Sequence, residues 1–248
     1  MRILVFLFLF SLARPALADC VILLHGLARS EGSLIVMEAA LDAEGFDVVR
    51  PGYPSTSASV EALADAVLPW ALDRCGAART HVVTHSMGGI LLRHWISANG
   101  IPDRLGRVVM MGPPNQGSEV VDTLGDLAAF GWINGPAGSQ LGTGPTSLPR
   151  KLPPVRYPVG VIAGSQSLNP YFSSLLPGPD DGKVSVDATR VDGMVAHLTL
   201  PVTHTFMMNN PRVLVQVVHF LRNGRFDPNL TWAEAVLDQL GGVDDARD

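Results

Sequence analysis

Short apolar runs alternate with helix-like segments along most of this 248-residue chain. Six runs are predicted as strands: 20–24, 46–50, 80–85, 107–111, 157–163 and 197–202. The run at 20–24 is continuously apolar, as expected for a strand that is covered on both faces. Four longer segments have helical spacing or the signals that start or end a helix: 31–44, 59–74, 87–98 and 211–221. Strands that alternate with helices are typical of parallel βαβ units. We therefore expect an α/β fold with a mostly parallel sheet of about six strands and helices on both faces.

The alternation stops between 112 and 158, where glycine and proline are frequent and charged residues are few. Only 124–132 has the pattern of a short helix there. A long irregular segment inside a compact domain is usually functional or mobile. We expect an irregular insertion at about 113–156 and a loosely held polar tail at 227–248.

The first residues have the three parts of a secretory signal peptide. Arg2 gives a positive start, an apolar run follows at 3–12, and Ala-Leu-Ala ends the segment at Ala18. A retained membrane anchor would need about 20 apolar residues, and a lipid anchor on Cys20 would follow a small residue rather than Asp19. We therefore expect cleavage after Ala18 and a mature protein in the periplasm or outside the cell.

The chain has two cysteines, Cys20 and Cys75. In an oxidising compartment an isolated pair is more often bridged than free, so we expect a disulfide between them. Two buried free thiols are the alternative.

Charge and motif content exclude several classes of function. The formal net charge is −5 and the only lysines are Lys151 and Lys183, whereas nucleic-acid binding relies on clustered basic residues. The histidines form no H-E-x-x-H pattern, and the cysteines are too far apart for a zinc knuckle. No G-x-G-x-x-G sequence follows a strand. We expect no metal, no cofactor and no nucleic-acid partner.

The segment at 82–89, Val-Val-Thr-His-Ser-Met-Gly-Gly, runs from an apolar strand directly into a helix, with Ser86 at the junction. Gly88 and Gly89 are the small neighbours that a sharp turn needs, and the helix N-terminus offers N–H groups to an oxyanion. The segment resembles the nucleophile elbow of α/β-hydrolases, and of bacterial lipases and esterases in particular. It departs from their usual G-x-S-x-G because Thr84 stands in place of the first glycine.

The resemblance implies the α/β-hydrolase fold for a domain at 19–226, with Ser86 as the nucleophile. It also implies that the insertion at 113–156 forms a cap or lid above the active site. Six apolar side chains there either line an acyl pocket or pack the insertion onto the domain: Leu124, Leu127, Phe130, Trp132, Ile133 and Leu148.

His25-Gly26-Leu27 follows the first predicted strand and is similar to the His-Gly turn of lipases. The resemblance implies that the N–H groups of Leu27 and Met87 form the oxyanion hole. Gly26 lets the main chain approach the substrate closely. His25 is expected to be hydrogen-bonded locally within the turn.

A serine nucleophile needs a base and an orienting carboxylate, and α/β-hydrolases carry them in the order Ser, acid, His. After Ser86, His94 and His219 fall within predicted helices. His197 begins a predicted strand, whereas His204 follows the end of that strand. Because Ser86 also follows a strand end, His204 shares its edge of the sheet and is the expected base.

The acid is expected after the strand at 157–163. Pro-Asp-Asp-Gly-Lys-Val at 179–184 resembles the D-G-x-V segment that carries the acid of lipases. This resemblance assigns the acid to Asp181, with Asp180 as the alternative. Asp187 follows a strand-like segment and is expected in a solvated turn.

These residues predict an exported serine hydrolase that cleaves carboxylic esters through an acyl-enzyme, as lipases and esterases do. The same triad would serve acyl transfer or thioester cleavage, and a non-catalytic binding module with this fold is a further alternative. The expected partner is a small-molecule or lipid ester. A transient contact of the cap with a membrane surface is a further prediction.

Overall fold

The computed structural model describes residues 18–124, 128–230 and 233. In that part of the chain six strands form one sheet in the order β2–β1–β3–β4–β5–β6, and every neighbouring pair is parallel. The strands are β1 (Cys20–Leu24), β2 (Asp47–Val49), β3 (Thr80–His85), β4 (Leu105–Met111), β5 (Val159–Gly164) and β6 (Ala196–Leu200). The predicted parallel sheet is confirmed.

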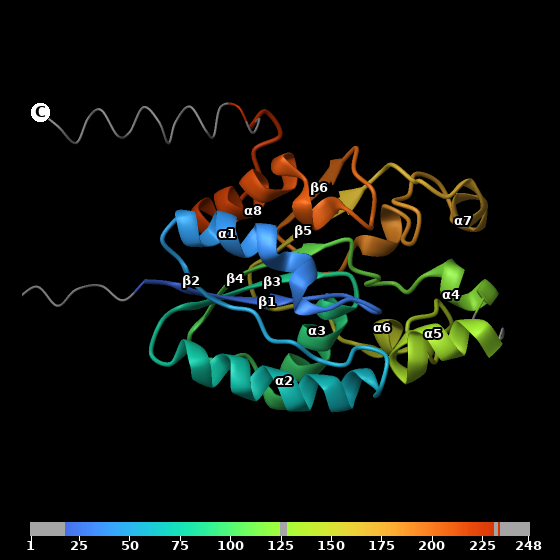
Figure 1. Ribbon diagram of the computed structural model, residues 1–248, viewed down its shortest axis with the longest axis horizontal. Helices are drawn as coiled ribbons and strands as arrows, with labels where there is room; N and C mark the ends of the chain where they lie inside the picture. Colours follow the sequence, from blue (N-terminus) through green and yellow to red (C-terminus); the bar gives the residue numbers. More distant parts are fainter. Residues whose placement is uncertain (1–17, 125–127, 231–232, 234–248) are drawn as a thin grey trace, which may run out of the picture.

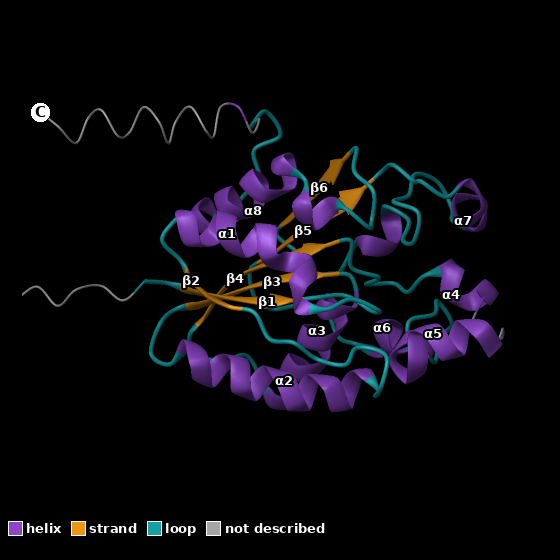
Figure 2. Cartoon of the chain, in the orientation of Figure 1, coloured by secondary structure: helices purple, strands orange, loops and turns teal. Residues whose placement is uncertain are grey.

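Helices cover both faces of this sheet (Figures 1 and 2). The four that pack on it are α1 (Ile35–Ala43), α2 (Val60–Cys75), α3 (Met87–Asn99) and α8 (Pro211–Asn223). Strand β1 shows how its side chains divide between the two faces. Val21 and Leu23 belong to the apolar cluster beside α1 and α8, whereas Ile22 and Leu24 belong to the cluster beside α2 and α3. Both faces of β1 are buried, which explains its continuous apolar run.

Local signals determine where these helices begin and end. The Ser59 hydroxyl accepts the N–H of Ala62 at 3.3 Å and caps α2. The expectation of one helix at 31–44 is wrong in its first turn, which is a 3₁₀ helix, η1 (Glu31–Leu34), followed by α1. The turn contains glycine and serine, which favour the α-helix less than the residues of α1 do.

The described part of the insertion contains three helices: α4 (Glu119–Leu124), α5 (Ala128–Ser139) and α6 (Leu148–Lys151). They lie beyond the carboxyl ends of the strands, as does α7 (Pro170–Leu175) (Figure 1). The predicted helix at 124–132 overlaps the end of α4 and the start of α5, and 125–127 lie outside the described residues. Gly135, with φ +61°, kinks α5 just before Pro136, and this break obscures the helical period in the sequence.

The predicted acyl pocket falls mostly outside the described side chains. Of its six residues, Leu148 is described, and it packs against the apolar cluster beside α2 and α3. The other five lie at 124–133, where no side chain is described.

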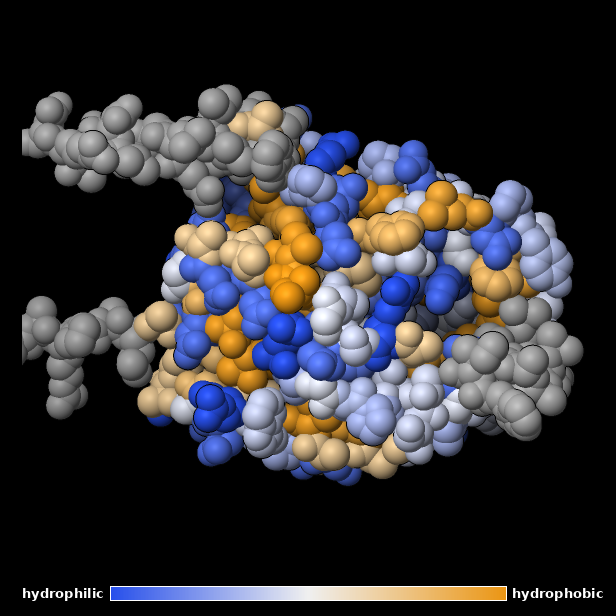
Figure 3. All heavy atoms as spheres, viewed as in Figure 1, coloured by the Kyte–Doolittle hydropathy of each residue, from blue (hydrophilic) through white to orange (hydrophobic). Residues whose placement is uncertain are grey.

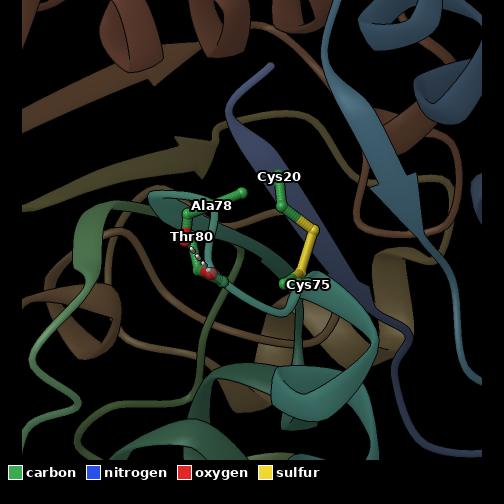
Figure 4. Close-up of a disulfide and its surroundings, with 4 residues drawn as sticks. All are labelled: Cys20, Cys75, Ala78 and Thr80. Carbon is green, nitrogen blue, oxygen red and sulfur yellow. Dashed lines mark hydrogen bonds between the residues drawn. A yellow bond between two sulfur atoms is a disulfide. The ribbon is translucent and has the colours of Figure 1, made fainter. Parts of the chain in front are cut away.

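A disulfide joins β1 to α2 through Cys20 and Cys75, whose Cα atoms are 5.6 Å apart (Figure 4). Cys75 ends α2, and the chain then turns into β3 with the Thr80 hydroxyl donating to the Ala78 carbonyl at 3.3 Å. The bridge expected from the two cysteines is therefore present. The predicted signal peptide lies almost entirely outside the described residues. In the part that is described, no helix has the length and hydropathy needed to span a bilayer.

Candidate active site

Ser86 lies at the junction of β3 and α3 with a φ of +52°. Among the described residues other than glycine, only Ala28 shares a positive φ. Such a conformation costs on the order of 1–3 kcal/mol and persists only where the surroundings impose it. Here the Ser86 N–H donates to the Met111 carbonyl at 2.8 Å, which holds the turn against β4. The sharp turn leaves the Ser86 side chain partly exposed above the end of the sheet.

The residues around Ser86 explain why the turn tolerates Thr84 in place of the first glycine of G-x-S-x-G. Gly88 packs directly on the end of β1, because a Cβ there would lie 2.6 Å from the Leu24 carbonyl oxygen. Thr84 is fully buried, and its hydroxyl lies beside the Cα of Gly89. Thr84 needs no positive φ, so a β-branched residue fits at this position provided that position 89 has no side chain.

His204 lies beyond the end of β6, which stops at Leu200 rather than at 202. Its Nε2 atom is 3.0 Å from the Ser86 Oγ, so the neutral imidazole can accept the hydroxyl proton. Its Nδ1 atom is 2.7 Å from Oδ2 of Asp181. The imidazole thus bridges a hydroxyl and a carboxylate that are 95 positions apart in the sequence.

Main-chain hydrogen bonds orient the Asp181 carboxylate, which has no exposed surface. Its Oδ1 atom accepts the N–H groups of Lys183 and Val184 at 3.0 and 2.9 Å. This leaves Oδ2 for the His204 ring. The Asp181 carbonyl also accepts the His204 N–H at 2.9 Å, so main chain and side chains both link the two residues.

The other candidate residues contact different groups. Asp180 Oδ1 accepts the Ser173 hydroxyl and the Gly182 N–H at 2.8 and 2.7 Å. Asp187 is exposed and lies 3.5 Å from Arg190. Of the three histidines not chosen as the base, His94 lies in α3, whereas His197 contacts Thr189 and His219 contacts Asn223. Within the described ranges, no three His, Cys, Asp or Glu side chains are grouped to hold a metal ion.

The turn after β1 lies against the serine. A Cβ on Gly26 would be 3.0 Å from the Ser86 Cβ. Leu27 and Met87 are the next residues along the chain after Gly26 and Ser86. His25 stacks on Tyr53 with ring centroids 3.7 Å apart, and its Nδ1 donates to the Gly26 carbonyl at 3.0 Å. Burial lowers the pKa of His25, and the Tyr53 hydroxyl donates to the His25 carbonyl.

Comparison with known proteins agrees with this architecture. A family model of the alpha/beta hydrolase fold matches residues 19–135. No curated protein sequence matches the chain significantly. The mature form of the Bacillus licheniformis lipase BlEst2 superposes with a TM-score of 0.64 at 16% identity, over 85% of this chain and 94% of that one. The chain therefore has the α/β-hydrolase fold.

Two further solved structures resemble this chain. Phospholipase PlaB from Legionella pneumophila has a TM-score of 0.63 at 17% identity, over 85% of this chain and 60% of that one. Aspergillus fumigatus lipase B has a TM-score of 0.61 at 18% identity, over 87% of this chain and 56% of that one. The chain thus spans little more than half the length of those two proteins, and identities this low show the fold alone.

Two buried residues of this protein were not predicted from its sequence. Arg93 of α3 donates from Nη1 to the main-chain and side-chain oxygens of Asn115, and from Nη2 to the carbonyls of Leu152 and Pro153. It thereby ties both ends of the insertion to α3, and burial lowers its pKa to about 10. The second is His85, beside Ser86. The only sequence signal for either was a polar residue in an otherwise apolar segment.

Proposed function

We propose that this protein is an exported serine hydrolase of the lipase or carboxylesterase type, which cleaves carboxylic esters. The observation that carries the proposal is the line of contacts from Ser86 Oγ to His204 Nε2 at 3.0 Å and from His204 Nδ1 to Asp181 Oδ2 at 2.7 Å. A serine, a base and an orienting carboxylate at these distances can form and release an acyl-enzyme. The names of the similar structures, lipases and a phospholipase, support an ester or lipid substrate.

In the first half of the reaction, Ser86 Oγ attacks the ester carbonyl carbon while its proton passes to His204 Nε2. The carbonyl oxygen becomes an oxyanion, and we assign its stabilisation to the N–H groups of Leu27 and Met87. The bond to the leaving alcohol then breaks, and the alcohol takes the proton from Nε2. Asp181 accepts the Nδ1–H throughout, so it holds the ring orientation and stabilises the imidazolium.

In the second half, a water molecule replaces the alcohol. His204 Nε2 takes a proton from the water as its oxygen bonds to the acyl carbon, and the proton then returns to Ser86 Oγ when the acyl–serine bond breaks. The products are a carboxylic acid and free enzyme. Neither half calls for a cofactor, because Ser86 and water supply the nucleophilic oxygens and His204 carries the protons.

The disulfide supports the export part of the proposal, because such bonds persist mainly in oxidising compartments. The signal-like segment that ends at Ala18 supports it independently. Contact with a membrane surface stays a prediction. Large apolar side chains that are exposed include Ile35 and Val36 on α1 and Phe206 near His204 in sequence, and Figure 3 shows apolar side chains interspersed with polar ones on the face that it presents.

An active-site-directed fluorophosphonate tests the nucleophile. We expect it to label the native protein and the surface variant Ser174→Ala equally, and to leave folded Ser86→Ala unlabelled. We also expect Ser86→Ala to lower kcat on p-nitrophenyl esters by about 10⁴-fold to 10⁶-fold. Native protein that is folded and unlabelled would contradict the proposal and favour a binding module. Labelling of the native protein without ester hydrolysis would instead favour acyl transfer as its function.

A further inference from the structure

The side chain of His85, the last residue of β3, lies between the two loops that meet at Ser86. It is 1% exposed. Its Nε2 atom is 3.0 Å from the main-chain oxygen of His204, and the two rings are 4.9 Å apart between centroids. Its opposite edge faces the turn after β1, because a Cβ on Gly26 would lie 3.0 Å from Nδ1 of His85.

The contact with a carbonyl oxygen fixes the proton of His85. A carbonyl can only accept, so Nε2 carries the hydrogen and donates it. Nδ1 is buried and has no hydrogen-bond partner in the described part of the chain. Burial, followed by the nearby His204 ring, holds the pKa of His85 well below its ordinary value. His85 therefore stays neutral in this one tautomer while a neighbouring imidazole gains and loses a proton.

Hydrogen bonds therefore hold both the N–H group and the carbonyl group of His204. Its N–H donates to the Asp181 carbonyl at 2.9 Å, and its carbonyl accepts from His85 at 3.0 Å. Without the second bond, only the N–H side of the residue would be anchored by these contacts. A rotation of the peptide unit there would move the imidazole relative to Ser86.

We propose that His85 is a positioning residue for the base: its Nε2–H fixes the main chain of His204 so that the imidazole stays aligned with Ser86 Oγ. His85 touches no reacting atom and acts through His204. This inference rests on the proposed function. Misplacement of a reacting group by about 1 Å can lower a rate about 100-fold, so losing this hydrogen bond should lower kcat with little effect on KM.

The side chains of glutamine and asparagine separate this role from simple packing. In His85→Gln the amide nitrogen is as many bonds from Cα as Nε2 of histidine, so the donor is retained. In His85→Asn the amide is one bond too short, and in His85→Leu no donor remains. We expect kcat on a p-nitrophenyl ester to fall about 10-fold to 100-fold in the Leu and Asn variants. We expect KM to stay close to the wild-type value and His85→Gln to recover most of kcat.

Kinetic constants are compared per active site, counted by fluorophosphonate titration, beside the Tm of each variant. Leu68→Ala, in the apolar cluster away from His85, serves as the stability control, because it should lower Tm without lowering kcat. Wild-type kcat in both His85→Leu and His85→Asn would overturn the inference, as would a glutamine variant no more active than asparagine. If the leucine variant does not fold, the glutamine–asparagine comparison decides alone. Wild-type protein that neither hydrolyses esters nor reacts with the phosphonate would instead remove the proposed function.

Discussion

Asp180 and Asp181 are adjacent and both buried, yet their carboxylates have different partners. Asp181 directs Oδ2 to His204 because two main-chain N–H groups occupy its Oδ1. Asp180 instead accepts the Gly182 N–H and the Ser173 hydroxyl, which links the turn to α7. The two residues therefore allow an experiment in which the same chemical change is made one position apart.

We expect Asp181→Asn to lower kcat by about 10⁴-fold, because an amide nitrogen donating to Nδ1 would leave the proton of His204 on Nε2, where it cannot accept from Ser86. Asp180→Asn keeps an acceptor oxygen toward Gly182 and should leave kcat unchanged. Hydrolysis of a p-nitrophenyl ester by the two folded variants measures the difference. An equal loss in both would mean that the turn, rather than the carboxylate facing the base, is what the reaction requires.

The meeting of Ser86 and His204 was predictable because each follows a strand of a parallel sheet, whose carboxyl ends share one edge. The acid needed the family resemblance to select it from two adjacent candidates. The role of His85 could not be predicted, because its hydrogen bond reaches a main-chain carbonyl 119 positions away. A sequence pattern indicates that a side chain is buried but not which peptide group it meets.

At the scale of elements, the buried strands were easier to predict from the sequence than a short helix. Strands β1, β3 and β5 were predictable because burial on both faces favours apolar residues along their whole length. Helix α7 was missed although Asn169 caps it, accepting the N–H groups of Tyr171 and Phe172, and Pro170 begins it. A helix of six residues is too short to show a helical period, so its cap was the only local signal.

The disulfide links two elements that pack on each other, β1 and α2, across 55 positions. By restricting the unfolded chain, a bridge over a loop of this length contributes about 4 kcal/mol on the chain-entropy model. We expect the Cys20→Ala/Cys75→Ala variant to lose about 2–4 kcal/mol in free energy of unfolding, measured with urea. Dithiothreitol should destabilise the wild type by a similar amount and leave the double variant unaffected. Equal stability of oxidised and reduced wild type would contradict this expectation.

At the scale of the whole molecule, burial lowers the pKa of four histidines, which lie in one turn and two strands. His25 lies in the turn after β1, His81 and His85 lie in β3, and His197 lies in β6, where burial lowers its pKa to about 4. Each is therefore neutral in the folded protein at a pH where the unfolded chain already binds protons, because an exposed histidine has a pKa near 6.5. The unfolded chain binds more protons than the folded one in this range.

The sign of the pH dependence follows directly. The free energy of unfolding should be largest above the ordinary histidine pKa and should fall as the pH decreases from about 6.5 toward about 4, because protons then favour the unfolded chain. Urea unfolding measured between about pH 7 and about pH 4.5 tests this. His197→Gln offers the sharpest comparison, because an amide can still hydrogen-bond to Thr189 but does not titrate. Its stability should decline less steeply with acid than that of the wild type, and identical slopes would show that burial of His197 does not contribute.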